Sequence, residues 1–395
     1  MTLKELAESL GVTTYPEKLE KIYLELPEDD GAIYNRDYII GLQEKYNLLG
    51  PYLDLVLSGA EEIKTKPNLL TWARLGAEYV KRVGCYESRQ MKIPTSDGSL
   101  AMDMLPVLIL LSAVPNAVKL YEARGFSEAQ IRKNLDNIRI NIWVREITLG
   151  RPMLDQGLFG WLTLYMKALI FDHKAFNFQP NNWGFQALVL KNKESGEHEM
   201  IMLETKAHKS GLIFGSAGCE DEEGSFMTTF VETADVYVAH RAVNGRIQPK
   251  ATVFPKSEWE CVLRPGDDTI GLHIPRKTNL DDEYVGESLR EGLELTKKYY
   301  PEFSPKYIIC SSWLMEPAIV DILGPDAKLS KFTSRFLKHP RKDASGAGCL
   351  GYVWPGNHGP VENYEENTSL QRGIKRRMLD GGHVLAFSGV IVDLK

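Results

Sequence analysis

The pattern of apolar residues changes along the chain, and residues 268–289 show the change clearly. Apolar and polar residues alternate over 269–274, which predicts a strand with one apolar face. The apolar positions are Ile270, Leu272 and Ile274. His273 falls on the opposite face, and Pro275 ends the strand because proline cannot donate to a sheet ladder. Apolar residues then recur every four positions, which predicts a helix over 282–299.

Residues 1–150 follow a helical period instead. Apolar residues recur there at spacings of three and four, and glycine or proline interrupts the pattern where short helix connections are expected. The most apolar run is Met104–Val114. It is shorter than the ~20 residues of a membrane-spanning helix, and Pro106 and Ser112 interrupt it. We therefore expect a buried helix there and no membrane association.

After residue 150 one more helix leads into strand-like segments, and from Thr269 strands and helices alternate. The predicted order is strand 269–274, helix 282–299, strand 307–310, a short helix near 316–323, a strand-like segment 329–336, helix 369–380 and strand 383–394. This succession predicts an α+β fold, in which a helical domain over 1–150 precedes a mixed α/β domain over 151–395.

Charge and cysteine content narrow the classes of function. The 395 residues carry a formal net charge of −6, which gives no general attraction to nucleic acid. The five cysteines are scattered and no two have the spacing of a zinc motif, so we expect neither a metal site nor a disulfide framework. The N-terminus has no apolar signal core. A cytoplasmic protein fits these features best.

Candidate catalytic residues lie at the carboxyl ends of two predicted strands, where ligands gather in open α/β sheets. His273 ends the first strand, and its imidazole can act as a base near neutral pH, although a structural histidine is the alternative. The second strand ends in "CSSWLMEP". There Cys310 is a nucleophile or a buried thiol, and Glu316 is a general base or a first-turn acid of the short helix.

The loop after the first strand is a candidate phosphate site. Backbone N–H groups at a helix N-terminus bind phosphate, and Arg276 and Lys277 add positive charge there. The alternative is a solvated loop before a helix that is capped by its own acids, Asp281, Asp282 and Glu283.

Several stretches together resemble a bacterial family of acyltransferase-domain-containing proteins. These proteins have a helical N-acyltransferase N-terminal domain and a GNAT-like C-terminal domain. The resemblance rests on Leu158–Phe171, Leu272–Pro275, Pro301–Phe303, Cys310–Pro317, Lys331–Phe336 and Thr368–His383. Members tend to have a glycine-rich loop after the first of these strands, whereas this chain has "RKTN".

The resemblance implies a GNAT-like fold and acetyl-CoA or another acyl-CoA as co-substrate, with a small-molecule amine or hydroxyl as acceptor. We assign His273 as the general base and Glu316 as the second candidate for that role, the reserve base. Ser312, or a backbone amide near Trp313, would stabilise the oxyanion or protonate the thiolate. The residues expected to contact the cofactor are Pro275, Arg276, Lys277, Cys310 and Trp313.

Two other classes of function stay open from the residues. A binding protein for acyl-CoA or another small molecule, without catalysis, would explain the "RKTN" loop. A hydrolase would use Cys310 or Ser312 as nucleophile, but the nucleophile-elbow motif is absent.

Overall fold

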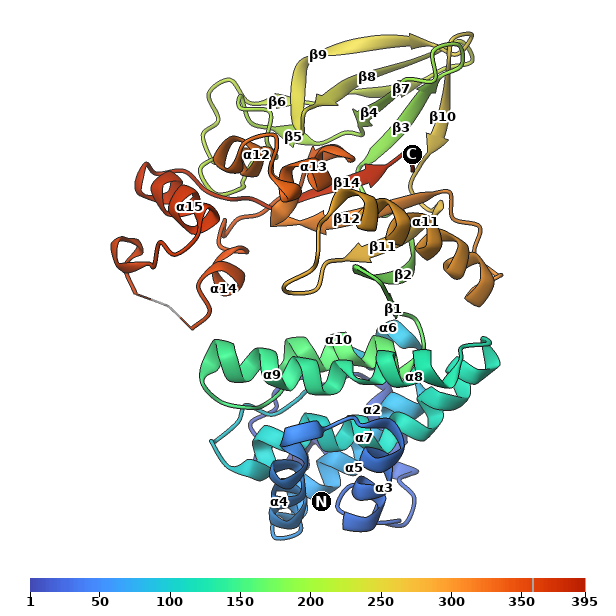
Figure 1. Cartoon of the computed structure of the whole chain (residues 1–395), viewed down its shortest axis with the longest axis vertical. Helices are drawn as coiled ribbons and strands as arrows, with labels where there is room; N and C mark the ends of the chain where they lie inside the picture. The colour runs from blue at the N-terminus through green and yellow to red at the C-terminus, as the bar shows by residue number, and fades with distance from the viewer. Residues whose placement is uncertain (357–358, 395) are drawn as a thin grey trace. The chain divides into compact units, whose positions relative to one another are not determined.

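Figure 1 shows a computed structural model of the chain, which describes residues 1–356 and 359–394. The chain divides into two compact units, Met1–Asp172 and His173–Lys395. The sequence places the domain boundary at residue 150 instead. The difference arises because α10 (Gln156–Met166) packs against α7 (Leu100–Ala123) and so belongs to the first unit.

The N-terminal unit is helical, and α7 is its central helix. Met104–Val114 is buried throughout, because α4, α5 and α10 pack around α7. By length and composition α7 could cross a membrane, but 83% of its most apolar 18-residue stretch is buried inside the unit. The other helices are α1 (Leu3–Ser9), α2 (Lys18–Leu24), α3 (Arg36–Tyr46), η1 (Gly50–Tyr52), α4 (Leu53–Ile63), α5 (Pro67–Arg82), α6 (Cys85–Ser88), α8 (Glu128–Leu135) and α9 (Asn137–Leu149).

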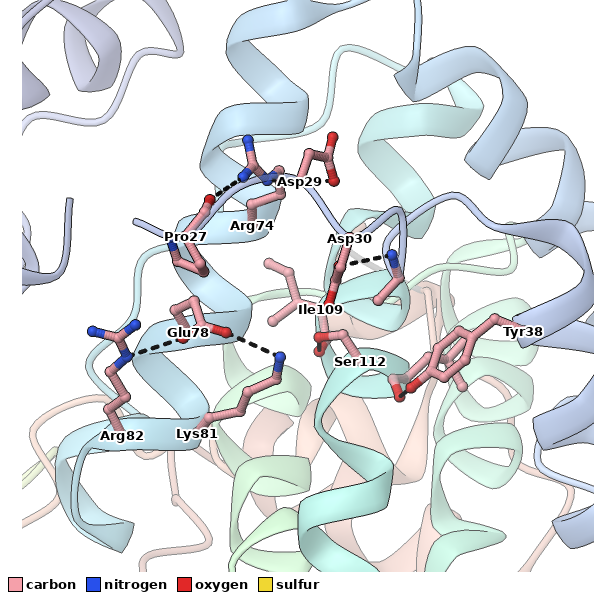
Figure 2. A network of polar contacts seen from close by, with 12 residues as sticks. Pro27, Asp29, Asp30, Tyr38, Arg74, Glu78, Lys81, Arg82, Ile109 and Ser112 are labelled. Carbon is pink, nitrogen blue, oxygen red and sulfur yellow. Dashed lines mark hydrogen bonds and ion pairs between the residues drawn. The ribbon is translucent and has the colours of Figure 1, made fainter. Parts of the chain in front are cut away.

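Polar contacts attach α3 and the segment before it to α5 and α7 (Figure 2). Arg74 of α5 donates to the Pro27 carbonyl over 2.5 Å and lies 3.5 Å from the Asp29 carboxylate. The Tyr38 hydroxyl donates to the Leu111 carbonyl of α7 over 3.0 Å. That carbonyl lacks the usual helical donor, because the residue four positions on, Pro115, has no N–H.

Replacing Tyr38 by phenylalanine is therefore expected to lower the free energy of unfolding by about 1–3 kcal/mol, the cost of leaving a buried carbonyl unpaired. Urea unfolding measures this change. Pro115→Ala restores an N–H donor to Leu111, so the same tyrosine substitution should cost less in that background. An equal cost in both backgrounds would contradict the account.

The described part of the chain forms two sheets of six strands each and a two-stranded pair, β5–β6. All these strands lie in the C-terminal unit except β1, which spans the boundary between the units at Asp172. The first sheet has the order β1-β2-β11-β12-β14-β13; the second has the order β10-β3-β4-β8-β7, with β9 paired to β8. The strands are β1 (Phe171–His173), β2 (Phe176–Asn182), β3 (Ala187–Asn192), β4 (His198–Met202), β5 (Lys206–Ala207), β6 (Phe226–Met227), β7 (Phe230–Glu232), β8 (Val236–Val243), β9 (Arg246–Pro255), β10 (Trp259–Leu263), β11 (Asp268–His273), β12 (Tyr307–Ser312), β13 (Leu337–Pro340) and β14 (Phe387–Ile391).

Three of the predicted strands share the first sheet, as β11, β12 and β14. β11 and β12 run parallel, whereas β2 with β11, β12 with β14 and β13 with β14 pair antiparallel. The predicted strand over 383–394 is shorter in the structure, where β14 spans Phe387–Ile391. The α+β fold class is confirmed.

Within residues 1–356 and 359–394, seven helices follow β11: α11 (Asp282–Tyr299), η2 (Trp313–Met315), α12 (Ala318–Leu323), α13 (Lys328–Ser334), α14 (Leu350–Val353), η3 (Val361–Asn363) and α15 (Ser369–Leu379). Of these, α11 and α13 pack on one face of the first sheet. α11 lies against β2 so closely that a Cβ at Gly292 would stand 2.2 Å from the Phe178 ring. The Phe332 ring of α13 stacks on Phe176 of β2, with 5.4 Å between ring centroids.

The strand predicted over 329–336 is wrong, because most of this segment is helix α13. Phe332 and Phe336 are both buried, and their rings touch edge to face with 5.3 Å between centroids. Four-residue spacing places both side chains on one side of a helical turn, whereas the sequence alone also allowed an alternating pattern.

The other face of the first sheet packs on the second sheet. Ile309 of β12 and Val390 of β14 share a buried cluster with Val189 of β3 and Met200 of β4. The unit is thus layered as helices, sheet and sheet. The carboxyl ends of β11 and β12 lie in the middle layer.

Candidate active site

The parallel ladder between β11 and β12 ends before either strand does. The last two residues paired in register are Gly271 of β11 and Ile309 of β12. Beyond that pair β11 continues to His273 alongside β2, and β12 continues to Ser312 alongside β14. The two strands therefore part at their carboxyl ends, and the candidate site lies at this point.

The predicted alternation along β11 is found. Ile270 and Leu272 are buried on the face that α11 covers, since Leu272 pairs with Phe178. His273 falls on the opposite face and is half-buried. Ile274 lies beyond the end of the strand.

Polar residues of β2 share the face of His273. Residues opposite one another in an antiparallel pair project to the same side, so Asn177 and Gln179 lie on this face with His273. The His273 Nε2 and the Gln179 Oε1 are 3.0 Å apart, at hydrogen-bond distance. Sequence reasoning missed Gln179, because the register of β2 against β11 cannot be read from either strand alone.

The loop after β11 turns tightly at Arg276 and Lys277. Lys277 has a φ of 60°, in the left-handed region that favours glycine. The Thr278 hydroxyl closes the turn by donating to the Pro275 carbonyl over 2.6 Å. The backbone here therefore takes a conformation that a glycine-rich loop adopts without strain.

Two of the predicted cofactor-binding residues meet at Tyr352 of α14. The Arg276 guanidinium donates to the Tyr352 carbonyl over 3.3 Å. The Trp313 and Tyr352 rings lie 6.4 Å apart between centroids. Tyr352 is 62% exposed, so this cluster faces solvent, and sequence analysis did not single it out.

Two of the three acids at the start of α11 are paired with cations at the two ends of α13. Lys328 forms an ion pair with Asp281 and holds the pKa of that carboxyl below its usual value. Arg335 lies 2.7 Å from the Asp282 carboxylate. Asp281 is the N-cap residue but makes no capping hydrogen bond with its side chain. The negative charge that would repel a phosphate here is thus partly neutralised.

Cys310 and Ser312 are placed differently on β12. Cys310 is buried, and burial raises the pKa of its thiol to about 12, so a nucleophilic thiolate is disfavoured at neutral pH. Ser312 is half-buried, and its hydroxyl oxygen accepts the Leu314 N–H over 3.1 Å. Because it accepts in this bond, the Ser312 hydroxyl can still donate its hydrogen.

Glu316 lies in a buried ion-pair cluster. Its Oε1 is 3.3 Å from Nη2 of Arg377 and 3.6 Å from Nη2 of Arg246, and its Oε2 accepts the Leu385 N–H. Burial raises the pKa of Glu316, and these three donors oppose that rise. The side chain has no exposed surface. An acceptor could not reach the expected reserve base without displacing its partners, so the geometry favours a structural role.

From its place at the carboxyl end of the strand, we expect His273 to face a pocket shared with residues 310–316, and this stays a prediction. Two surface hollows, of about 490 Å³ and 630 Å³, are lined by other residues. The first lies in the N-terminal unit; the second lies beside Leu293, Pro301 and Phe303. Within residues 1–356 and 359–394, no group of three or more His, Cys, Asp and Glu side chains could hold a metal ion.

Comparison with protein families identifies the class to which this architecture belongs. The model of an N-acyltransferase N-terminal domain matches residues 45–168, and the model of a GNAT-like C-terminal domain matches residues 189–391. The second match alone covers more than half of the chain. The chain therefore belongs to the acyltransferase family that combines these two domains.

Solved structures share the fold at low sequence identity. One is an acyltransferase in complex with decanoyl-CoA, at 15% identity and a TM-score of 0.68. Others are an acyltransferase with decanoyl-CoA and teicoplanin, at 13% and 0.67, and one with CoA and 10C-teicoplanin, at 13% and 0.68. Each match covers 99% of both chains. A comparison with curated proteins gives no match.

Proposed function

We propose that this protein transfers an acyl group from acyl-CoA to an amine or hydroxyl of a small molecule. The observation that carries the proposal is the parting of β11 and β12 beyond Gly271 and Ile309, with His273 at the end of one strand and Ser312 at the end of the other. The family and the CoA complexes of the similar structures support the same donor. Their bound teicoplanin supports a small-molecule acceptor.

The residues at the strand ends can serve the two steps of a direct transfer. His273 takes a proton from the acceptor, whose nitrogen or oxygen then attacks the thioester carbonyl. The carbon–sulfur bond breaks as the new amide or ester forms. Ser312, or a backbone N–H near Trp313, donates to the oxyanion or to the departing CoA thiolate.

The phosphates of the donor would lie at the loop between β11 and α11. The loop and the start of α11 carry two cations, Arg276 and Lys277, and three acids, Asp281, Asp282 and Glu283. Lys328 and Arg335 pair with two of these acids, so the cations of this region outnumber its acids. The N-terminus of α11, an 18-residue helix, adds the positive end of its dipole.

The double substitution Arg276→Glu and Lys277→Glu is expected to weaken CoA binding about 100-fold or more. Each cation can supply charge-assisted hydrogen bonds of about 1.5–3 kcal/mol to a phosphate. The loss should be larger at low ionic strength, where screening is weak. Isothermal titration with CoA at two salt concentrations measures both effects.

The matched control is Lys277→Gly, which removes one charge but suits the left-handed backbone at this position. It should fold at least as stably as the wild type and lose less affinity than the double variant. Unchanged CoA affinity in the double variant would exclude this phosphate site.

The proposed activity is tested by release of the CoA thiol from acetyl-CoA and decanoyl-CoA, with and without a panel of small amines and alcohols. An acyltransferase releases thiol when an acceptor is present and forms the matching amide or ester. Release without any acceptor would indicate a hydrolase. A thermal shift with CoA but no release under any condition would indicate a binding protein.

A further inference from the structure

Gln179 is a nearly buried amide whose side chain reaches the candidate base. It is 5% exposed and stands on β2 opposite Gly271. His273 is two positions further along β11, a diagonal neighbour that a long side chain can reach. Gln179 Oε1 lies 3.0 Å from His273 Nε2.

β2 lies close to β11 at Gly271. A Cβ there would stand 3.3 Å from Nδ2 of Asn181 and 3.5 Å from the Gln179 backbone carbonyl. A buried amide is costly unless it is hydrogen-bonded, so its bond to the imidazole restrains both groups.

We propose that Gln179 is a positioning residue that fixes the orientation and tautomer of His273. This inference rests on the proposed role of His273 as base. When the amide oxygen accepts a hydrogen bond from Nε2, the neutral ring carries its hydrogen on Nε2 and its lone pair on Nδ1.

An amide suits this role better than a carboxylate. A carboxylate at the same place would stabilise the imidazolium and hold the ring in its charged form, which cannot accept a proton. The neutral amide orients the ring without adding charge.

Two substitutions separate orientation from charge. Gln179→Met keeps the length of the side chain but removes the acceptor, and it should lower kcat about 10–100-fold with little change in the KM for acetyl-CoA, as loss of an orienting partner does. Gln179→Glu should move the acidic limb of the pH–rate profile to higher pH. Asn181→Ala, on the same face, is the control and should leave kcat unchanged.

Nitrogen-15 NMR of the imidazole in each full-length variant reads the tautomer without reference to activity. The wild type should show the Nε2–H form, and Gln179→Met a mixture of both neutral forms. A wild-type ring in the Nδ1–H form, or the same tautomer in wild type and Gln179→Met, would overturn the inference. If Gln179→Met changes the tautomer but not kcat, His273 is not the base, and the proposed function fails at that step rather than at the hydrogen bond.

Discussion

Replacing His273 by alanine is expected to lower turnover about 10²–10⁴-fold, the range that a positioned general base contributes. In the wild type the rate should rise with pH as the imidazole loses its proton. The alanine variant should lack that limb, because the imidazole that titrates in that range is gone. Steady-state rates with acetyl-CoA and a fixed amine between pH 5 and 9 measure both effects.

His198→Ala is the matched control for that experiment. His198 is a half-buried strand histidine at the start of β4 in the second sheet, and its loss should leave the pH profile unchanged. A His273→Ala variant with normal turnover, or with low turnover and an unaltered acidic limb, would assign His273 a structural role instead.

Loss of the Glu316 carboxylate is expected to have the largest effect on stability. Glu316→Ala should lower the free energy of unfolding by about 3–5 kcal/mol, because it leaves two guanidiniums and the Leu385 N–H without their shared acceptor. The lower part of that range is expected, since Arg246 and Arg377 are partly exposed to water. Chemical denaturation measures the change.

Two further variants serve as comparisons for the stability loss of Glu316→Ala. Glu316→Gln keeps an acceptor for the Leu385 N–H and should lose less stability than the alanine variant. Glu294→Ala removes an exposed acid that faces Lys297, and it should change stability by less than about 1 kcal/mol. A Glu316→Ala variant with normal stability but a missing limb in its pH–rate profile would restore Glu316 as a base.

Elements with one strong pattern could be predicted from the sequence. The helix predicted over 282–299 is α11 as observed, because its apolar spacing and acidic start agree. The alternation before Pro275 correctly placed His273 opposite Leu272. The strand predicted over 329–336 was wrong, because a short run with few apolar residues fits both the strand period and the helix period. The packing of Phe332 on Phe176 decided in favour of the helix.

The partners of the candidate residues could not be predicted, because they come from distant parts of the chain. Glu316 is held by groups at positions 246, 377 and 385, and His273 by an amide at position 179. Local spacing says nothing about which strands become neighbours or in what register. The sequence therefore indicated the strand ends where the candidate residues lie, but not the hydrogen bonds that fix them.

The short contact between β11 and β12 has a mechanical consequence. Three residue pairs are in register between these strands, whereas β11 and β2 share six and β12 and β14 share five. The middle layer therefore consists of two well-paired parts, β2 with β11 and β12 with β14, joined by the short β11–β12 ladder. We call this ladder the seam. A small rotation about the seam would strain few hydrogen bonds. The amides of the seam should exchange with solvent faster than those of either half.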